Sequence, residues 1–271
     1  MDREITVILT LYKTPYNLLY SLRQYKKYKV IIFEQAPNKD SKKKIEKISN
    51  IKFDYYSSKK NIGLPKASNF LLSKVQTRYL LFTQPDIKID NKSIINLKKS
   101  FKVNKNVILS SPTYSKKRTK IKKSLLKNYI EKTRLNMACV LCDTKKLKKI
   151  GFFDEDFFLY WEDVFLMKKI NFSKFKMIQV LDSYAVHSGS KSSIKDYKVN
   201  FIRNSNFKYG EFLFDFKTRK FRSLKMIRQI IQNILYSFIN LLFFKKESLL
   251  KNLSNIYGIY KFIIFFLIRD K

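Results

Sequence analysis

The chain of 271 residues is long enough for one large domain, or for one domain with an appendage. Its 45% hydrophobic content is that of a globular protein and excludes a collagen-like or fully disordered chain. The 57 Lys and Arg residues against 21 Asp and Glu give a net charge of +36, which suits nucleic acid or an anionic membrane. Because Lys, Asn, Ile, Phe and Tyr all have A/T-rich codons and Arg is scarce, we favour genome composition as the cause and expect no nucleic-acid partner.

The first residues, MDRE followed by ITVILTLY, lack the pattern of a signal peptide. No stretch reaches the roughly 18 uninterrupted apolar residues that would predict a membrane span. Two cysteines cannot make a disulfide framework, so we expect a cytoplasmic protein. Cys139 and Cys142 lie three apart in an expected strand and therefore point to opposite faces, which argues against a zinc or redox site.

The first half of the chain alternates strand-like and helix-like patterns. We expect strands at 5–12, 29–34, 51–56 and 78–83, with helices at 16–28, 41–49 and 64–75. This alternation predicts an α/β fold with a mostly parallel sheet and flanking helices. Ligands of such sheets bind outside the carboxyl ends of the strands.

The second half continues the pattern and then changes composition. We expect helices at 92–103 and 144–150, strands at 106–111, 136–142 and 176–187, and a basic, mobile loop at 115–124. Residues 196–271 are basic, with apolar helical patterns at 224–244 and 256–268. We therefore predict an α/β domain at 1–195 and a helical extension at 196–271 that contacts a membrane surface. The alternatives are helices that pack on the domain, or a dimer interface.

Two loops at strand ends are candidate ligand sites. In NIGLPKASN (61–69), Gly63 lets the backbone approach an anionic ligand, and Asn61 and Asn69 are placed to hold the loop or a sugar. A plain turn explains this segment equally well. Asp86, in TQPD, is a carboxylate where a divalent cation would bridge phosphates, although aspartate beside proline is also common in turns.

The strongest signal is IGFFDEDFFLYWEDVFL (150–166), which places five acids within ten positions among seven aromatic residues. Aromatic neighbours desolvate a carboxylate and raise its pKa toward that of a general base. The alternative is an amphipathic helix with solvated acids. His187, the only histidine, ends an expected strand and is a candidate metal ligand or phosphate contact.

In order and spacing, these segments resemble the family 2 glycosyltransferases of GT-A fold, especially the rhamnosyltransferase-like branch, over residues 5–193. GFFDEDFFLYWEDVFL is similar to the family's Gly-x-Phe-Asp-Glu…Phe-x-x-x-Glu-Asp run, and HSGSKS matches its His-x-Gly-x-Ser. NIGLPKASN and QPD are similar to its Asn-x-Gly…Asn loop and its Asn-Pro-Asp metal motif. Three positions depart from the family, because Glu34 replaces Asp, Gln84 replaces Asn and Phe165 stands where Asp is frequent.

The resemblance implies an inverting, metal-dependent enzyme that moves a sugar from a nucleotide-diphosphate sugar to an acceptor hydroxyl. The implied donor is dTDP-rhamnose or a UDP-sugar, and the implied acceptor is a glycan or a lipid-linked glycan of a bacterial surface polysaccharide or glycolipid. The enzyme would act in the cytoplasm, at the inner face of the cell membrane. The alternatives are a basic nucleic-acid-binding protein and an inactive sugar-binding member of the same fold.

The resemblance also assigns roles to individual residues. The implied donor-binding residues are Thr10, Tyr12, Glu34, Asn61, Gly63, Asn69 and Asp86, with a Mg or Mn ion at Asp86 and His187. The implied catalytic residues are Asp163, as the base, and Glu162, which lines the acceptor side, and the implied acceptor contacts are Tyr160 and Trp161. We expect Asp86 and Asp163 to face each other across one cleft.

Overall fold

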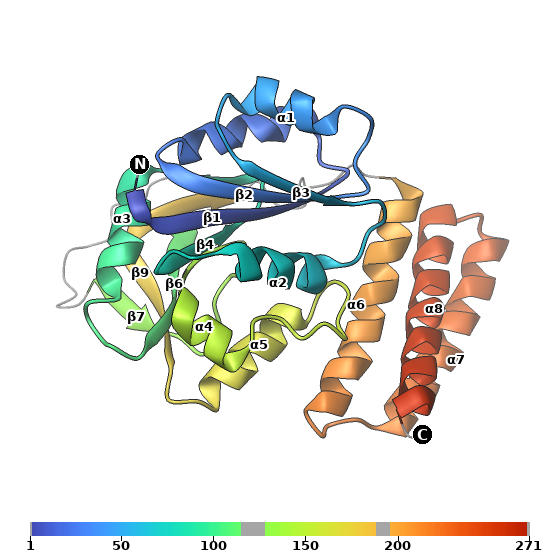
Figure 1. Ribbon diagram of the computed structural model, residues 1–271. Helices are drawn as coiled ribbons and strands as arrows, with labels where there is room; N and C mark the ends of the chain where they lie inside the picture. Colours follow the sequence, from blue (N-terminus) through green and yellow to red (C-terminus); the bar gives the residue numbers. More distant parts are fainter. Residues whose placement is uncertain (1, 115–127, 188–195, 270–271) are drawn as a thin grey trace. The chain divides into compact units, whose positions relative to one another are not determined.

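The computed structural model of this protein describes residues 2–114, 128–187 and 196–269 (Figure 1). The chain divides into two units, the first comprising Met1–Asp154 and Leu166–Ile194, the second Glu155–Phe165 and Lys195–Lys271. Helix α5 (Glu162–Asn171) has its first turn in the second unit and its remainder in the first. The functional division into 1–195 and 196–271 stays a prediction.

A nine-stranded sheet forms the centre of the first unit. Its strands lie in the order β3 (Asp54–Ser58), β2 (Tyr28–Gln35), β1 (Asp2–Tyr12), β4 (Tyr79–Thr83), β8 (Cys139–Asp143), β6 (Val107–Tyr114), β9 (Lys176–His187) and β5 (Ile87–Ile89), and β7 (Tyr129–Glu131) pairs with β9. The strands from β3 to β4 run parallel. Beyond them the sheet is mixed, because β8 is antiparallel to β4 and β6, and β9 is antiparallel to β5 and β7.

The α/β fold with flanking helices is confirmed, with one correction. Among the described strands, parallel and antiparallel pairings are equally numerous, so the sheet is mixed rather than mostly parallel. The apolar pattern of a strand reports its burial and carries no information on its direction. A strand was expected at 136–142, where β8 lies, but its antiparallel direction could not be recognised from its sequence.

Helices cover both faces of the sheet. One face packs against the 3₁₀ helix η1 (Tyr16–Tyr25), α1 (Ser41–Ser49) and α3 (Asn91–Ser100), and the other against α2 (Leu64–Lys74), α4 (Thr144–Ile150) and the later part of α5. Burial on both sides explains why the central strands are continuous apolar runs. Cys139 lies in the first of these cores and Cys142 in the second, which confirms that their side chains point to opposite faces.

The predicted elements agree closely with the observed ones. The bounds of α1, α4 and β9 are as predicted. The helix expected at 16–28 is the 3₁₀ helix η1, and two three-residue strands, β5 and β7, were not predicted. The basic segment 115–124 lies outside the described residues.

The second unit consists mainly of α6 (Tyr197–Lys217), α7 (Ser223–Leu242) and α8 (Lys246–Arg269). Phe157 lies in its core with Phe212 and Phe262. Helices α6 and α8 approach closely at Gly258, where an added Cβ would collide with the backbone of Ser205. Of the helices in the described ranges, none is both long and apolar enough to cross a membrane.

Candidate active site

Asp86 lies just beyond the carboxyl end of β4, between that strand and β5. A turn in which Ile87 N donates to Gln84 O (3.2 Å) positions it, and Ser21 Oγ of η1 holds the carbonyl of Pro85 at 2.6 Å. The side chain is buried, and neither carboxylate oxygen accepts a hydrogen bond from the described residues. Because burying a charged group without a partner is costly, this carboxylate requires a positive group at its side.

The sheet brings His187 to this carboxylate. His187 ends β9, which is antiparallel to β5 with Ile87 opposite His187. His187 Nε2 consequently lies 3.3 Å from Asp86 Oδ2, while the imidazole keeps 27% of its surface exposed. The two residues assigned to a metal ion by resemblance are therefore neighbours in space, one buried and one partly accessible.

The donor chemistry of this pair fits a divalent cation. Carboxylate oxygen and imidazole nitrogen are both ligands of Mn²⁺-like ions, and Asp86 offers two oxygens without a hydrogen-bond partner. Within 2–114, 128–187 and 196–269, no group of three or more His, Cys, Asp or Glu side chains is arranged to hold a metal. A cation at Asp86 and His187 would thus take its remaining ligands from substrate or water.

Glu34 and the end of β1 lie on the same edge of the sheet. Both oxygens of Glu34 accept a hydrogen bond, from Ser41 Oγ and from the Tyr55 hydroxyl, each at 2.7 Å. Burial and the adjacent Glu34 raise the pKa of Tyr55 well above its ordinary value. By strand alternation, Thr10 and Tyr12 point to the opposite face of the sheet from Glu34.

The loop before α2 is built by its own polar groups. Asn61 Oδ1 accepts from Gly63 N at 3.0 Å, and Ile62 N donates to Gln35 Oε1 at 2.9 Å. Gly63 has φ 89°, a conformation that side-chain-bearing residues rarely adopt, and it begins the helix at its N-cap. The loop therefore needs glycine at this position.

Asn69 holds a backbone segment that is distant in the chain. Its Nδ2 donates to Phe153 O at 2.9 Å, and its Oδ1 accepts from Phe153 N at 3.1 Å. This double hydrogen bond ties α2 to the start of the acid-aromatic segment. A contact from Asn69 to the donor sugar stays a prediction.

The acid-aromatic segment turns sharply before α5. Tyr160 and Trp161 have φ of 70° and 69°, so two successive residues occupy the left-handed region, which is strained for side chains of this size. The Trp161 ring packs against Phe207 and Phe214 of α6, with centroid separations of 5.6 and 5.3 Å. This packing holds the strained turn in place.

Glu162 follows this turn as the first residue of α5. Burial, with a smaller effect from neighbouring Asp163, raises its pKa to about 8. Its Oε2 has no hydrogen-bond partner among the described residues. Asp163 is less buried, and its Oδ1 accepts from Val164 N at 2.8 Å. The desolvated carboxylate that the aromatic residues predict is therefore Glu162.

The facing of Asp86 and Asp163 stays a prediction, since Asp86 belongs to the first unit and Asp163 to the second. Sequence reasoning missed the residues that position the site, including Ser21 and Gln24. Gln24 bonds to the backbone of β5 twice. Its Nε2 donates to Ile87 O at 2.9 Å, and its Oε1 accepts from Ile89 N at 2.8 Å. Ser21 and Gln24 both lie among the polar residues of an amphipathic helix pattern, and nothing in the sequence distinguishes them from Asn17 or Arg23.

A protein-family model described as Glycosyl transferase family 2 matches residues 8–166. A comparison with curated proteins found no match. One similar solved structure is GalNAc-T7 with UDP, GalNAc and Mn²⁺, which has a TM-score of 0.60 and 10% identity and covers 76% of this chain and 47% of that chain. A second is the mannosyltransferase PcManGT from Pyrobaculum calidifontis with GDP-Man and Mn²⁺, which has a TM-score of 0.56 and 13% identity and covers 76% of this chain and 62% of that chain.

Another similar structure is S. aureus TarS 1-349 (TM-score 0.54, 14% identity, 95% of this chain and 91% of that chain), which has also been solved with UDP and with UDP-GlcNAc. The present chain thus spans about half of GalNAc-T7, about three fifths of PcManGT and most of that TarS fragment. At these identities the structures share the fold, which is GT-A. Because the family model matches more than half of the chain, from β1 into α5, this protein belongs to glycosyl transferase family 2.

Proposed function

We propose that the protein is an inverting, metal-dependent glycosyltransferase of the rhamnosyltransferase-like branch. Its donor is a nucleotide-diphosphate sugar, dTDP-rhamnose or a UDP-sugar, and its acceptor is a glycan or lipid-linked glycan of a bacterial surface polysaccharide or glycolipid. The transfer takes place in the cytoplasm, at the inner face of the cell membrane. The observation that carries the proposal is the buried carboxylate of Asp86, whose oxygens lack a hydrogen bond and lie beside His187.

Asp86 and His187 form the donor side of this proposal. They would hold a Mg or Mn ion, which when bound neutralises the charge that develops on the leaving diphosphate. The GalNAc-T7 and PcManGT structures both contain Mn²⁺, which supports a divalent cation in this fold. The other proposed donor-binding residues are Thr10, Tyr12, Glu34, Asn61, Gly63 and Asn69.

Asp163 accepts the proton of the acceptor hydroxyl in the proposed reaction. The acceptor oxygen then bonds to the anomeric carbon, and the bond from that carbon to the diphosphate oxygen breaks with its electron pair leaving on the diphosphate. One such displacement inverts the anomeric configuration. Glu162, with a pKa of about 8, is mostly protonated at neutral pH and poorly suited to accept a proton, which supports Asp163 as the base.

Tyr160 and Trp161 would line the acceptor side. Their strained backbone, held by ring packing in the second unit, supports a functional role, because strain of this kind gathers at active sites. Aromatic faces also suit the apolar faces of sugar rings.

Donor binding and turnover test the proposal. Thermal unfolding is followed with UDP-, GDP- and dTDP-sugars, with and without Mn²⁺ or Mg²⁺, and turnover is measured with the stabilising donor. We expect stabilisation that requires the cation, and we expect Asp86→Asn to lose it. The matched control is Asp54→Asn, which removes an exposed carboxylate of β3 that pairs with Lys29 at 3.2 Å.

Equal cation-dependent stabilisation of Asp86→Asn and the unaltered protein would contradict the assignment of Asp86. Donor binding with neither transfer nor donor hydrolysis would instead favour a sugar-binding protein of the same fold.

A further inference from the structure

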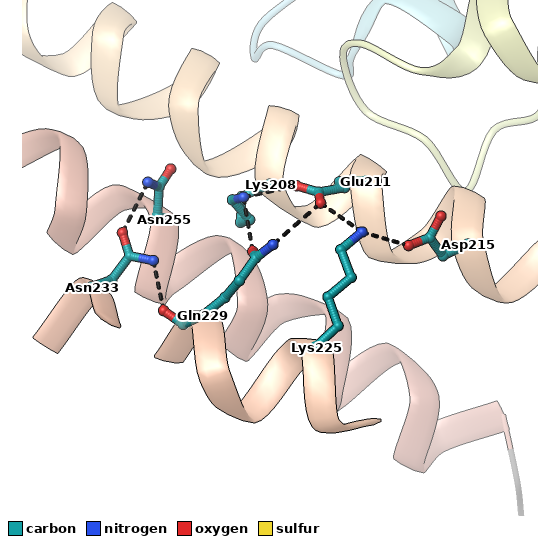
Figure 2. A network of polar contacts seen from close by, with 7 residues as sticks. All are labelled: Lys208, Glu211, Asp215, Lys225, Gln229, Asn233 and Asn255. Carbon is teal, nitrogen blue, oxygen red and sulfur yellow. Dashed lines mark hydrogen bonds and ion pairs between the residues drawn. The ribbon is translucent and has the colours of Figure 1, made fainter. Parts of the chain in front are cut away.

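Helix α7 faces its neighbours with polar side chains (Figure 2). Lys225 Nζ lies 2.8 Å from both Glu211 Oε1 and Asp215 Oδ2 of α6. Gln229 Oε1 accepts from Lys208 Nζ at 2.9 Å, and on the α8 side Asn255 Nδ2 donates to Asn233 Oδ1 at 3.0 Å. These contacts fix which side of α7 is turned toward α6 and α8.

The apolar side chains of α7 mostly point away from this network. Asn233 is the one residue of the helix that is buried, and Met226 and Ile230 pack on the core of the unit. The remaining large apolar residues of α7 are exposed: Leu224, Ile227, Ile231, Ile234, Leu235, Tyr236, Phe238, Ile239, Leu241 and Leu242. A helix in water is expected to bury its apolar side and expose its polar side, which is the reverse of the arrangement in α7. An apolar medium outside this unit must therefore cover the exposed apolar side.

Six of these exposed residues, Leu224, Ile227, Ile231, Ile234, Phe238 and Leu241, form one stripe along the whole helix. The spacing of 224, 227, 231, 234, 238 and 241 alternates three and four residues, which keeps their side chains on one side. Leu224 is 80% exposed and Phe238 is 63% exposed. The stripe continues into the turn after the helix, where Phe244 is 91% exposed.

Charge indicates what covers the stripe. Residues 223–242 contain two basic residues and no acid. Exposed basic side chains lie just outside both ends of the helix, namely Arg219, Lys220 and Arg222 at one end and Lys245 and Lys246 at the other. Anionic head groups would pair with these cations, and long basic side chains reach head groups while neighbouring apolar residues enter the acyl region.

We propose that the exposed stripe of α7 docks on the surface of a membrane that contains anionic lipid. The helix lies parallel to the surface, because one side is apolar along its full length and the other is held in polar contacts. A second copy of the chain fits less well, since residues 223–242 contain no acid and the five exposed cations at the two ends outnumber Glu247, the exposed acid beside Lys246. Membrane docking is independent of the sugar-transfer chemistry.

Vesicle flotation of the full chain, without donor or acceptor, tests this proposal. We expect flotation with phosphatidylcholine–phosphatidylglycerol vesicles and much weaker flotation with phosphatidylcholine alone. Ile231→Glu, which puts a charge in the stripe, should weaken binding by about tenfold or more. Gln232→Glu adds the same charge to the next exposed residue, outside the stripe, and should bind nearly as well as the unaltered protein.

An environment-sensitive dye at Ile234→Cys gives a second readout. The two natural cysteines are fully buried, so the dye reacts with the introduced one. Its emission should shift to the blue on anionic vesicles. Absence of that shift, absence of flotation, or equal loss of binding in Ile231→Glu and Gln232→Glu would overturn the proposal. A dimer in sedimentation that Ile231→Glu abolishes, without vesicle binding, would also overturn it and assign the stripe to a second copy.

Discussion

The carboxylate of Asp86 and the imidazole of His187 lie 3.3 Å apart, although they come from distant parts of the chain. The contact arises because the short strand β5 follows Asp86 directly and pairs antiparallel with the end of β9. Asp86 is fully enclosed, whereas His187 is partly exposed. The pair therefore presents a buried negative group with an accessible nitrogen beside it, at the edge of the sheet where ligands of α/β folds bind.

Replacement of His187 should weaken the effect of the cation on donor binding. We expect His187→Ala to lower the Mn²⁺-dependent affinity for UDP by about tenfold or more, the scale on which partners in a metal site act. Calorimetric titration with and without Mn²⁺ measures this. Gln179→Ala, on the same strand β9, is the control and should titrate normally. An unchanged Mn²⁺ dependence in His187→Ala would remove His187 from the site.

Glu162 should make stability depend on pH. Its pKa in the folded protein is about 8, above the ordinary value of 4.5. Between these two values the folded state holds a proton that the unfolded state has lost, so stability falls as pH rises, by about 1.4 kcal/mol per pH unit from this group. Below pH 4.5 both states are protonated and the effect disappears.

Glu162→Gln should remove this slope. Urea unfolding at several pH values is expected to find the variant increasingly more stable than the unaltered protein from about pH 5 to 8, with no further gain above that. Glu247→Gln, at an exposed acid of α8, should leave the slope in place. Parallel pH profiles for Glu162→Gln and the unaltered protein would mean that Glu162 is ionised when folded.

Gly210 sets the position of Trp161. A Cβ at Gly210 would lie 2.8 Å from Trp161 Cδ1 and 3.1 Å from Tyr160 O, so Gly210→Ala must displace the indole ring. We expect a shifted emission of Trp161, the only tryptophan, together with a loss of about 1–3 kcal/mol in stability and reduced turnover.

Gly258→Ala is the matched control for this substitution. It crowds α6 and α8 at Ser205 and should lower stability without changing the Trp161 emission. Identical emission in Gly210→Ala and the unaltered protein would show that the ring is not held where the structure has it.

The sequence predicted the elements whose buried residues recur periodically, but it did not predict an element whose formation depends on tertiary contacts. The central strands and α1 and α4 are apolar or amphipathic over their whole length, so their patterns sufficed. Strand β5 is only three residues long. The backbone hydrogen-bonding groups on its two edges are paired with β9 and with the Gln24 side chain, and no local sequence pattern reveals these partners. Missing β5 also left the reason for the Asp86–His187 contact unseen.

The candidate site was predictable as a set of residue types, but not in its electrostatics. The aromatic residues predict a desolvated carboxylate, yet only the structure identifies Glu162 as the one with the raised pKa. Asn69 was expected to hold the loop or a sugar, and in the structure its amide holds the backbone of Phe153. A side-chain amide serves either purpose equally well, and its partner depends on tertiary packing.

Turnover and donor binding in Asp163→Asn, measured side by side, test the central assignment most directly. The substitution keeps the size of the side chain and removes its capacity to take a proton. We predict that the variant binds the nucleotide sugar with its cation as tightly as the unaltered protein while transfer falls by about 100-fold or more. Transfer by Asp163→Asn at the rate of the unaltered protein would contradict the role of Asp163 as the base.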